Sequence, residues 1–470
     1  MAMINTKSAL EAASDASKSA KQETKSPYVF LFVVLVFAAI ATWIIPAGSF
    51  DREMRDGISF VISGSLHPVA QNGALPLEVF TAIATGLQKS APIIFLILFT
   101  GGALAVLERT GAIHQALNGI ANSTRLNDFL IVAMFGLIFG ALGTTGVVVN
   151  AVVAFVPIGL LVAKSLGLNP IFGVSLVYLT CASGFNVALT NPVTTGLTQR
   201  LAHLPLFSGF GLRGITSALF ILACIVFLTL YVRACRKNGE RRPEVSEVTG
   251  QGEKATARHW VILAFASLCL GAFIYGAMTL KWGEVEMTAM FVFMAMVAGM
   301  IGRLSASDIA NSFLGGCSRI VSGALIVGMA RAISIVLENG HILDPIVGFL
   351  ADVLAPLHPA MAALGMYVSA ALMHFAISSG SGESALLIPI YVPIGDMIGL
   401  TRQVVVHAVL FGEGIVNCIN PTSGVLMGVL AVAGIPFGKW VKFVAPLIAV
   451  WMVICVVVLI VGVEIKWGPF

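Results

Sequence analysis

The chain has 470 residues, of which 58% are hydrophobic and only 11% charged, and its formal net charge is +4. Soluble domains carry about 25% charged residues, so this composition excludes a soluble globular protein and a disordered chain. We interpret the small positive charge as a sign of membrane topology and expect no binding to nucleic acid. The seven cysteines show no CxxC spacing, which predicts neither a disulfide framework nor a metal cluster. The sequence predicts a polytopic membrane protein.

Charged residues are concentrated at the N-terminus and in one central segment. Residues 1–27 hold seven charges, and residues 233–258 hold eleven, of which seven are Lys or Arg. We expect 1–27 to be a cytoplasmic tail and not a signal peptide, because the apolar run after it is long enough to span a bilayer. The Lys and Arg excess makes 233–258 a cytoplasmic linker under the positive-inside rule.

Apolar runs fill most of the remaining chain. A helix needs about 17–25 apolar residues to cross a bilayer, and the uninterrupted runs of that kind cover 28–48, 91–108, 213–232, 259–279, 286–302, 319–338 and 443–463. Four others are interrupted by Gly, Ser, Thr or Pro. Of these we expect 128–163 and 360–399 to be re-entrant hairpins, and 170–202 and 403–435 to be broken transmembrane helices. The predicted fold is all-α, with about nine full spans plus two hairpins.

The two halves of the chain resemble each other. Three pairs match at offsets of 230, 229 and 231 residues, namely Glu108 with Glu338, Asn191-Pro192 with Asn420-Pro421, and Leu204-Pro205 with Ile435-Pro436. We expect a first membrane repeat over 28–232 and a second over 280–470, with 259–279 as an additional span between them. Because that span reverses the face from which the second repeat starts, the repeats are predicted to be inverted, as in many secondary transporters.

An Asn-Pro pair interrupts each predicted broken helix. Asn is a strong N-cap and Pro suits the first helical turn, so each pair predicts that one half-helix ends and another begins. A single pair would be read as a proline kink, but two at corresponding positions predict a substrate site built from broken helices. The candidate substrate-binding residues at these breaks are Asn191, Thr194, Thr195, Asn420, Thr422 and Ser423.

Glycines and hydroxyl residues interrupt the two predicted hairpins. Glycine lets the backbone approach a ligand closely, half-helix N-termini favour a carboxylate, and carbonyls freed at broken ends could hold Na⁺. The alternative is that these small residues only permit close helix packing. The candidate substrate-binding residues at the tips are Gly143, Thr144, Thr145, Gly146, Ser379, Gly380, Ser381, Gly382 and Glu383.

A few ionisable and amide side chains lie within predicted spans. Glu413 lies midway through 403–419, and a charge at the bilayer centre costs about 2.5–3.5 kcal/mol on insertion scales. Such a residue is normally paired, protonated or functional. Arg331 is a candidate partner for it or an anchor for a substrate carboxylate. We predict that Glu413, Arg331 and Asn417 couple transport to Na⁺ or to protons, with the metal site unknown and no cofactor.

Several motifs resemble one transporter family. They are His374–Ala385, Ile394–Met397, Arg402-Gln403, Phe411–Gly414 and Asn420–Ser423. This string resembles the YfcC-like branch of the anaerobic C4-dicarboxylate carrier family, in the ion-transporter superfamily. The resemblance implies an elevator-type homodimer in the bacterial cytoplasmic membrane, with C4-dicarboxylates or basic amino acids as substrates. Thr144 and Thr145 stand where the family has an acidic pair, which argues against a cationic substrate.

We therefore expect a secondary transporter or antiporter that moves a small carboxylate-bearing metabolite across the bilayer. The alternatives are a polytopic membrane enzyme and a channel. The sequence lacks the HExxH, DDxxD and GxGD motifs of three membrane-enzyme classes, so the minimal parts of those enzymes are missing. A channel fits inverted repeats with broken helices less well than a transporter does.

Overall fold

The structure is a computed structural model. It describes residues 27–55, 58–113, 115, 127–146, 148–149, 151–239, 256–280 and 282–468. Residues 1–26 of the predicted cytoplasmic tail and residues 240–255 of the predicted linker lie outside this part of the chain.

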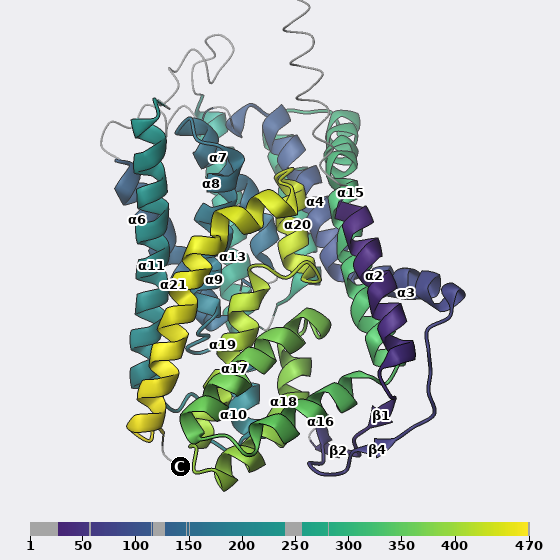
Figure 1. The fold of residues 1–470 in the computed structure, drawn as a ribbon. Helices are drawn as coiled ribbons and strands as arrows, with labels where there is room; N and C mark the ends of the chain where they lie inside the picture. The colour runs from purple at the N-terminus through teal and green to yellow at the C-terminus, as the bar shows by residue number, and fades with distance from the viewer. Residues whose placement is uncertain are drawn as a thin grey trace, which may run out of the picture.

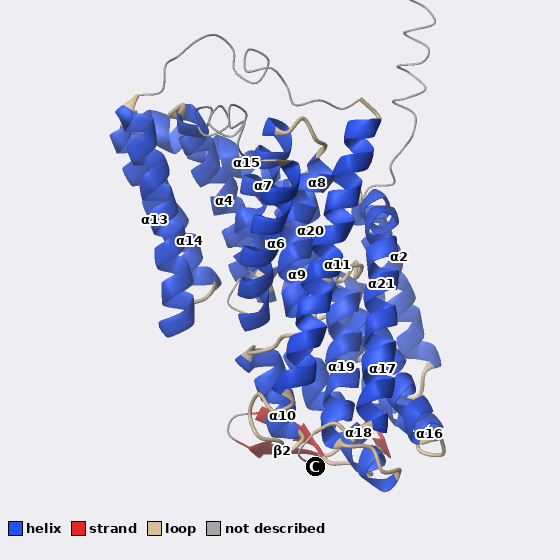
Figure 2. Cartoon of the chain, turned by 90° about the vertical axis from the view of Figure 1, so that its left-hand side faces the viewer, coloured by secondary structure: helices blue, strands red, loops and turns tan. Residues whose placement is uncertain are grey.

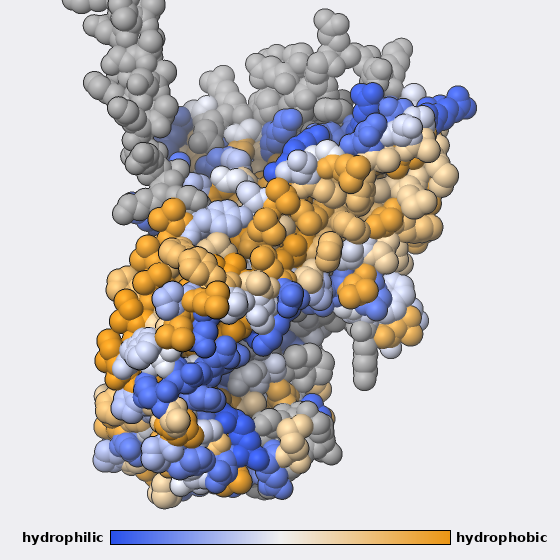
Figure 3. Space-filling view, turned by 90° about the vertical axis from the view of Figure 1, so that its right-hand side faces the viewer, coloured by the Kyte–Doolittle hydropathy of each residue, from blue (hydrophilic) through white to orange (hydrophobic). Residues whose placement is uncertain are grey.

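The described chain is almost wholly helical, and its few short strands lie together at one end (Figures 1 and 2). Within the described residues, seven helices are long and apolar enough to cross a membrane. Hydrophobic side chains cover much of the face in Figure 3, and hydrophilic ones gather toward its two ends. The prediction of an all-α polytopic membrane protein is therefore confirmed.

One set of helices packs around α15 (Ala306–Asn339), whose N-cap Ser305 accepts a hydrogen bond from the backbone N–H of Asp308. Helices α2 (Pro27–Ile44), α3 (Pro76–Lys89), α4 (Ala91–Arg109) and α14 (Glu284–Ile301) contact α15, and α13 (Ala257–Thr279) packs against α14. Glycine permits close contacts between these helices, since a Cβ on Gly316 would lie 2.2 Å from the carbonyl oxygen of Gly101 in α4. We call these six helices the α15 group.

The remaining helices form a second set, the α19 group, which the chain builds in two parts. The first part comprises α6 (Asp128–Thr145), η1 (Ala151–Phe155), α7 (Val156–Ser165), α8 (Pro170–Val174), η2 (Ser175–Leu179), α9 (Thr180–Phe185), η3 (Pro192–Gly196), α10 (Leu197–Leu201) and α11 (Phe210–Lys237). Helix α6 ends at Gly146, whose left-handed φ of 76° suits glycine. Helices α8, η2 and α9 run on without a gap, and helical structure stops over 186–191 before η3 begins.

The second part begins with an additional helix, α16 (Leu343–Leu354), and then has a similar order of elements. It continues with α17 (Pro359–Ala376), α18 (Gly380–Met397), α19 (Arg402–Asn417), α20 (Gly424–Val432) and α21 (Phe437–Glu464). Helices α17 and α18 are joined by the short turn 377–379, and Gly146 ends α6 five residues before η1 begins. Helix α19 stops before α20 begins, with a break over 418–423. A long helix then closes each part, α11 in the first and α21 in the second, and these two helices contact each other.

Two short antiparallel strand pairs lie beside α16 at the end of the molecule away from the N-terminus of α2 (Figure 1). Strand β1 (Gly48–Ser49) pairs with β4 (His67–Pro68), and β2 (Arg52–Arg55) pairs with β3 (Ile58–Val61). Arg52 anchors them, because its Nη2 lies 2.8 and 2.7 Å from the two carboxylate oxygens of Asp344 in α16. The backbone N–H of Phe50 donates to the same carboxylate. This charge-assisted contact, from one nitrogen to both carboxylate oxygens, ties the strands to the α19 group.

Candidate functional site

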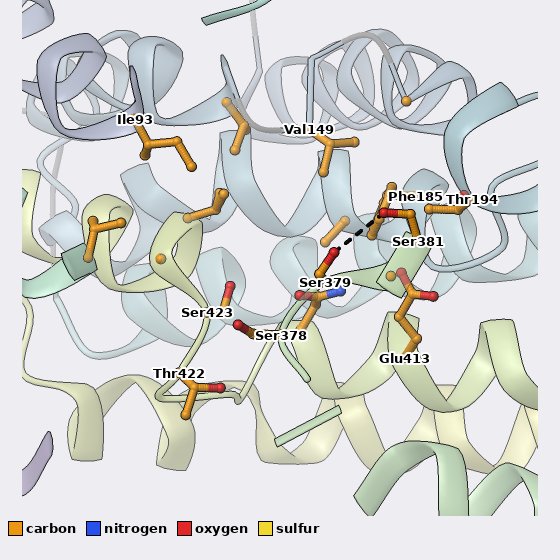
Figure 4. A pocket seen from close by; sticks show the side chains of 18 of the residues that line it. Ile93, Val149, Phe185, Thr194, Ser378, Ser379, Ser381, Glu413, Thr422 and Ser423 are labelled. Carbon is orange, nitrogen blue, oxygen red and sulfur yellow. Dashed lines mark hydrogen bonds between the residues drawn. The ribbon is translucent and has the colours of Figure 1, made fainter. Parts of the chain in front are cut away.

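A cavity of about 400 Å³ lies where the α15 group meets the α19 group. The α15 group contributes Lys89, Ser90, Ile93, Val327 and Arg331 to its wall. The other walls come from both parts of the α19 group (Figure 4). The predicted site residues that line the cavity are Gly146, Asn191, Thr194, Arg331, Ser379, Gly380, Ser381, Glu413, Asn417, Thr422 and Ser423. The structure thus brings residues from both predicted tips and both predicted breaks to one space.

The turn between α17 and α18 supplies a cluster of hydroxyls. Ser379 is the N-cap of α18, and its side chain accepts a hydrogen bond from the backbone N–H of Gly382 at 3.4 Å. Its hydroxyl also lies 3.4 Å from that of Ser381, as the dashed line in Figure 4 shows. Ser378 lines the cavity beside them. The N-terminus of an 18-residue helix therefore faces the cavity with hydroxyl donors around it.

Glu413 lies directly against this turn. A Cβ on Gly380 would lie 1.8 Å from Oε1 of Glu413, so a larger residue at position 380 would force the Glu413 carboxyl group to move. The Glu413 side chain is buried, and its Oε2 has no hydrogen-bond partner in the described structure. It is the only acidic side chain among the cavity-lining residues that the structure describes. The site therefore holds one carboxyl group with unused hydrogen-bonding capacity.

Glu383 and Asn420, which the sequence placed at the substrate, support the turn from behind and do not line the cavity. Glu383 Oε2 lies 2.6 Å from Nδ1 of His374, and both side chains are fully buried. This contact joins the last turn of α17 to the first turn of α18. The Asn420 Nδ2 donates to the carbonyl of His374, while its Oδ1 accepts from the N–H and the hydroxyl of Thr422. The N-cap of α20 is Ser423, three residues beyond the predicted Asn cap.

Asn191 caps the first break as predicted, since its Oδ1 accepts from the backbone N–H of Thr194 at 3.3 Å. Gly146 lies against it, because a Cβ there would come within 2.5 Å of the Asn191 amide. The first turn therefore touches the first break at the cavity wall. Gly146 has no side chain that would separate the turn from Asn191, and both residues line the cavity.

The other candidates in the first part of the α19 group lie away from the cavity. The hydroxyls of Thr144 and Thr145 donate to carbonyls of their own helix, and that of Thr195 donates to the carbonyl of Ala188. Gly143 serves packing, since a Cβ there would lie 2.0 Å from the carbonyl oxygen of Cys181. For these residues the close-packing alternative describes what the structure shows. Gly382 in the second turn is also absent from the cavity wall.

Two cations from the α15 group face the cavity. Arg331 is half-buried in α15, and within the described residues it forms no ion pair, with Glu413 or with any other acid. Lys89 is exposed at the C-terminus of α3. Lys89 and Ser90 could not be predicted as lining residues, because nothing in the residues around 76–91 indicates that this helix end faces a cavity. With Glu413 as the only acid, the lining carries more positive than negative side chains.

Comparison with known proteins gives one family and two curated relatives. Residues 25–464 match the family described as C4-dicarboxylate anaerobic carrier, DcuC. The chain is 28% identical to "Putative basic amino acid antiporter YfcC" of Escherichia coli (strain K12), over 92% of this chain and 95% of that protein. It is also 26% identical to an uncharacterized protein of Haemophilus influenzae, over 96% of this chain and 99% of that protein.

Two solved structures also show a likeness. The YdaH transporter of Alcanivorax borkumensis has a TM-score of 0.41 and 15% identity, with 94% of this chain and 100% of that chain covered. Neisseria gonorrhoeae MtrF, from a class of antimetabolite efflux pumps, has a TM-score of 0.40 and 16% identity, with 94% and 97% covered. Neither likeness is close enough to carry a conclusion about this chain.

Proposed function

The chain belongs to the C4-dicarboxylate anaerobic carrier family and is thus a membrane transporter, and we propose that it is a secondary active transporter or antiporter of a small carboxylate-bearing metabolite. The observation that carries this proposal is the cavity between the two helix groups. Hydroxyls at a helix N-terminus line one wall, and Arg331, which forms no ion pair with another described residue, lies on another. Both features favour a negatively charged ligand.

The charges around the cavity favour a dicarboxylate over a basic amino acid. A dicarboxylate can place one carboxyl group at the serine cluster of the α17–α18 turn and the other near Arg331 and Lys89. A basic amino acid would add its own positive charges to a lining that already carries Lys89 and Arg331, and Glu413 is the only acid among the described lining residues that could pair with them. The name of the Escherichia coli relative keeps basic amino acids in the panel of test substrates.

The order of elements supports inverted repeats and an elevator-type movement. Each part of the α19 group has a helix pair joined by a turn, then a broken helix and a long closing helix. Both turns and both breaks therefore lie on the α19 group, which would carry the substrate past the α15 group as one body. From the family resemblance we also propose that the protein is a homodimer in the bacterial cytoplasmic membrane, with its N-terminus in the cytoplasm.

Glu413 is the residue to which we assign coupling, because it is buried, faces the cavity and keeps one oxygen without a partner. A carboxylate ligand close to Glu413 disfavours the ionised form of its side chain, so Glu413 can take up a proton when the substrate binds and release it when the substrate leaves. Arg331 and Asn417 complete the proposed coupling set on the opposite and adjacent walls. Exchange against a second substrate is the other form of coupling that this cavity allows.

The proposal is tested by reconstituting the full chain in proteoliposomes and measuring the uptake of labelled succinate, fumarate, aspartate and arginine. We expect saturable uptake of at least one carboxylate, faster when the vesicles are loaded with the same compound. Vesicles carrying an Asn191→Ala or Ser381→Ala variant should take it up more slowly. Uptake of all four compounds no faster than into protein-free vesicles would refute the substrate class, and single-channel currents would indicate a channel instead.

A further inference from the structure

Helix C-termini in the α19 group expose carbonyl oxygens at the two breaks. The C-terminal end of a helix carries partial negative charge, and transporters with broken helices commonly bind a coupling Na⁺ at such ends and at unwound carbonyls. A carbonyl that already accepts a hydrogen bond from a protein donor is less available to an ion. The partners of these carbonyls therefore bear on whether the breaks bind Na⁺.

At the first break, the partner is a buried guanidinium. Arg213 of α11 is fully buried, and its Nη2 donates to the carbonyl oxygens of Ala188 and Leu189 at 2.7 and 2.6 Å. Its Nη1 donates to the carbonyl of Ser208 at 3.2 Å. No carboxylate pairs with Arg213 within the described residues. A buried charge without a counter-charge is costly, and among the described residues carbonyl dipoles compensate for it, two from the break after α9 and one from Ser208 before α11.

At the second break, neutral side chains donate hydrogen bonds to the carbonyl oxygens. The hydroxyl of Tyr178 donates to the carbonyl of Asn417 at 3.0 Å, and Nε1 of Trp440 donates to that of Cys418 at 2.8 Å. Ala188 and Cys418 are 230 positions apart, which is the spacing that relates the two halves of the sequence. Corresponding carbonyls in both breaks thus accept a side-chain donor from the helix that closes each part.

We propose that Arg213 is a resident cation of the first break, which occupies the place of a metal ion, and that the breaks of this transporter bind no Na⁺. The positive charge that a Na⁺-coupled carrier takes from solution is here part of the chain and stays in place throughout the cycle. One consequence is that a Na⁺ gradient does not drive uptake, and this consequence rests on the proposed transport function. The occupied carbonyls themselves do not depend on the substrate.

The test is the thermal stability of the purified full chain in detergent, in NaCl and in choline chloride at the same ionic strength. A ligand that binds only the native state raises the melting temperature, so Na⁺ bound at a break would raise the Tm. We expect the same Tm in both salts. A higher Tm in NaCl, or uptake that stops when choline replaces Na⁺, would overturn the inference. The Tm comparison remains valid even if no test substrate is transported.

Arg213→Ala removes the resident cation and leaves the carbonyls of Ala188 and Leu189 without it. We expect this variant to have a lower Tm in choline chloride and to regain part of the loss in NaCl, whereas Arg213→Lys gains nothing from NaCl. The matched control is Arg236→Gln on the same helix, which removes an ion pair with Asp128 away from the breaks and should show no effect of Na⁺. An Arg213→Ala protein that folds and ignores Na⁺ would show that Arg213 is only a structural brace. If that variant does not fold, the comparison of salts on the natural chain decides.

Discussion

Arg331→Gln should weaken carboxylate binding more than any other single change in the α15 group. The side chain is half-buried at the cavity and has no ion pair among the described residues, so its charge is available to a ligand. Glutamine keeps a hydrogen-bond donor but ends two bonds short of the guanidinium nitrogens. The substitution therefore removes both the charge and the reach of Arg331.

The magnitude follows from the position of the charge. A carboxylate about 4 Å from the guanidinium gains about 4 kcal/mol at an effective dielectric constant of about 20, before desolvation and side-chain ordering are subtracted. Hydrogen bonds to charged groups retain a net contribution of about 1.5–3 kcal/mol. We therefore expect Kd to rise about 10- to 150-fold. Arg331→Lys should lose less, because it keeps the charge but not the bidentate geometry.

The assay is calorimetric titration of the purified chain with the carboxylate that gives the fastest uptake. Arg319→Gln is the matched control, because Arg319 lies on the same helix but pairs with Glu108 at 3.5 Å in an exposed position. Exposed pairs contribute about 0–1 kcal/mol, and this one is absent from the cavity wall, so its Kd should not change. Equal Kd values for Arg331→Gln and the natural chain would refute our placement of the carboxylate.

Three other outcomes are expected. Gly143→Ala should lower the free energy of unfolding by about 1–3 kcal/mol, because the new Cβ would lie 2.0 Å from the Cys181 carbonyl oxygen. The control is Gly271→Ala, where nothing lies within 4 Å of the new Cβ. Equal Tm losses in the two variants would contradict the packing argument. Glu413→Gln should abolish proton-driven accumulation of substrate in proteoliposomes but keep substrate exchange. Accumulation at the normal rate would show that Glu413 does not couple transport to protons. Asp344→Asn should lower the Tm, since it replaces the buried carboxylate that accepts from Arg52 with a neutral amide. An unchanged Tm would show that this contact between the strands and α16 contributes no stability.

The sequence located the interruptions of the helices well. Asn191 and Asn420 lie in the gaps between helical segments, and Gly380 begins α18. These positions were predictable because Asn, Pro, Gly and Ser act through local backbone chemistry. Glu413 was predictable for another reason, since a carboxyl group within an apolar run is costly unless it has a role. The membership of the family, suggested by the motifs from His374 to Ser423, is confirmed by the match over residues 25–464.

Features that depend on how helices meet could not be predicted in this way. Lys89 lies at the end of a short amphipathic helix, and only the packing of α3 and α4 against α15 brings it to the cavity. Arg213 stands at the start of a predicted span, where a cation normally reaches toward the membrane surface, yet the structure buries it against the first break. Glu383 is polar and next to the turn, but its side chain points back to His374. Periodicity and motif spacing carry no information on these contacts.

The most direct test of the proposed function is an experimental structure of the full chain with the transported carboxylate bound. We predict density for the ligand in the cavity between the two helix groups, with one carboxyl group at Ser379 and Ser381 and the other in contact with Arg331. Density for the ligand outside this cavity, or inside it without contact to either the serines or Arg331, would contradict the proposed site.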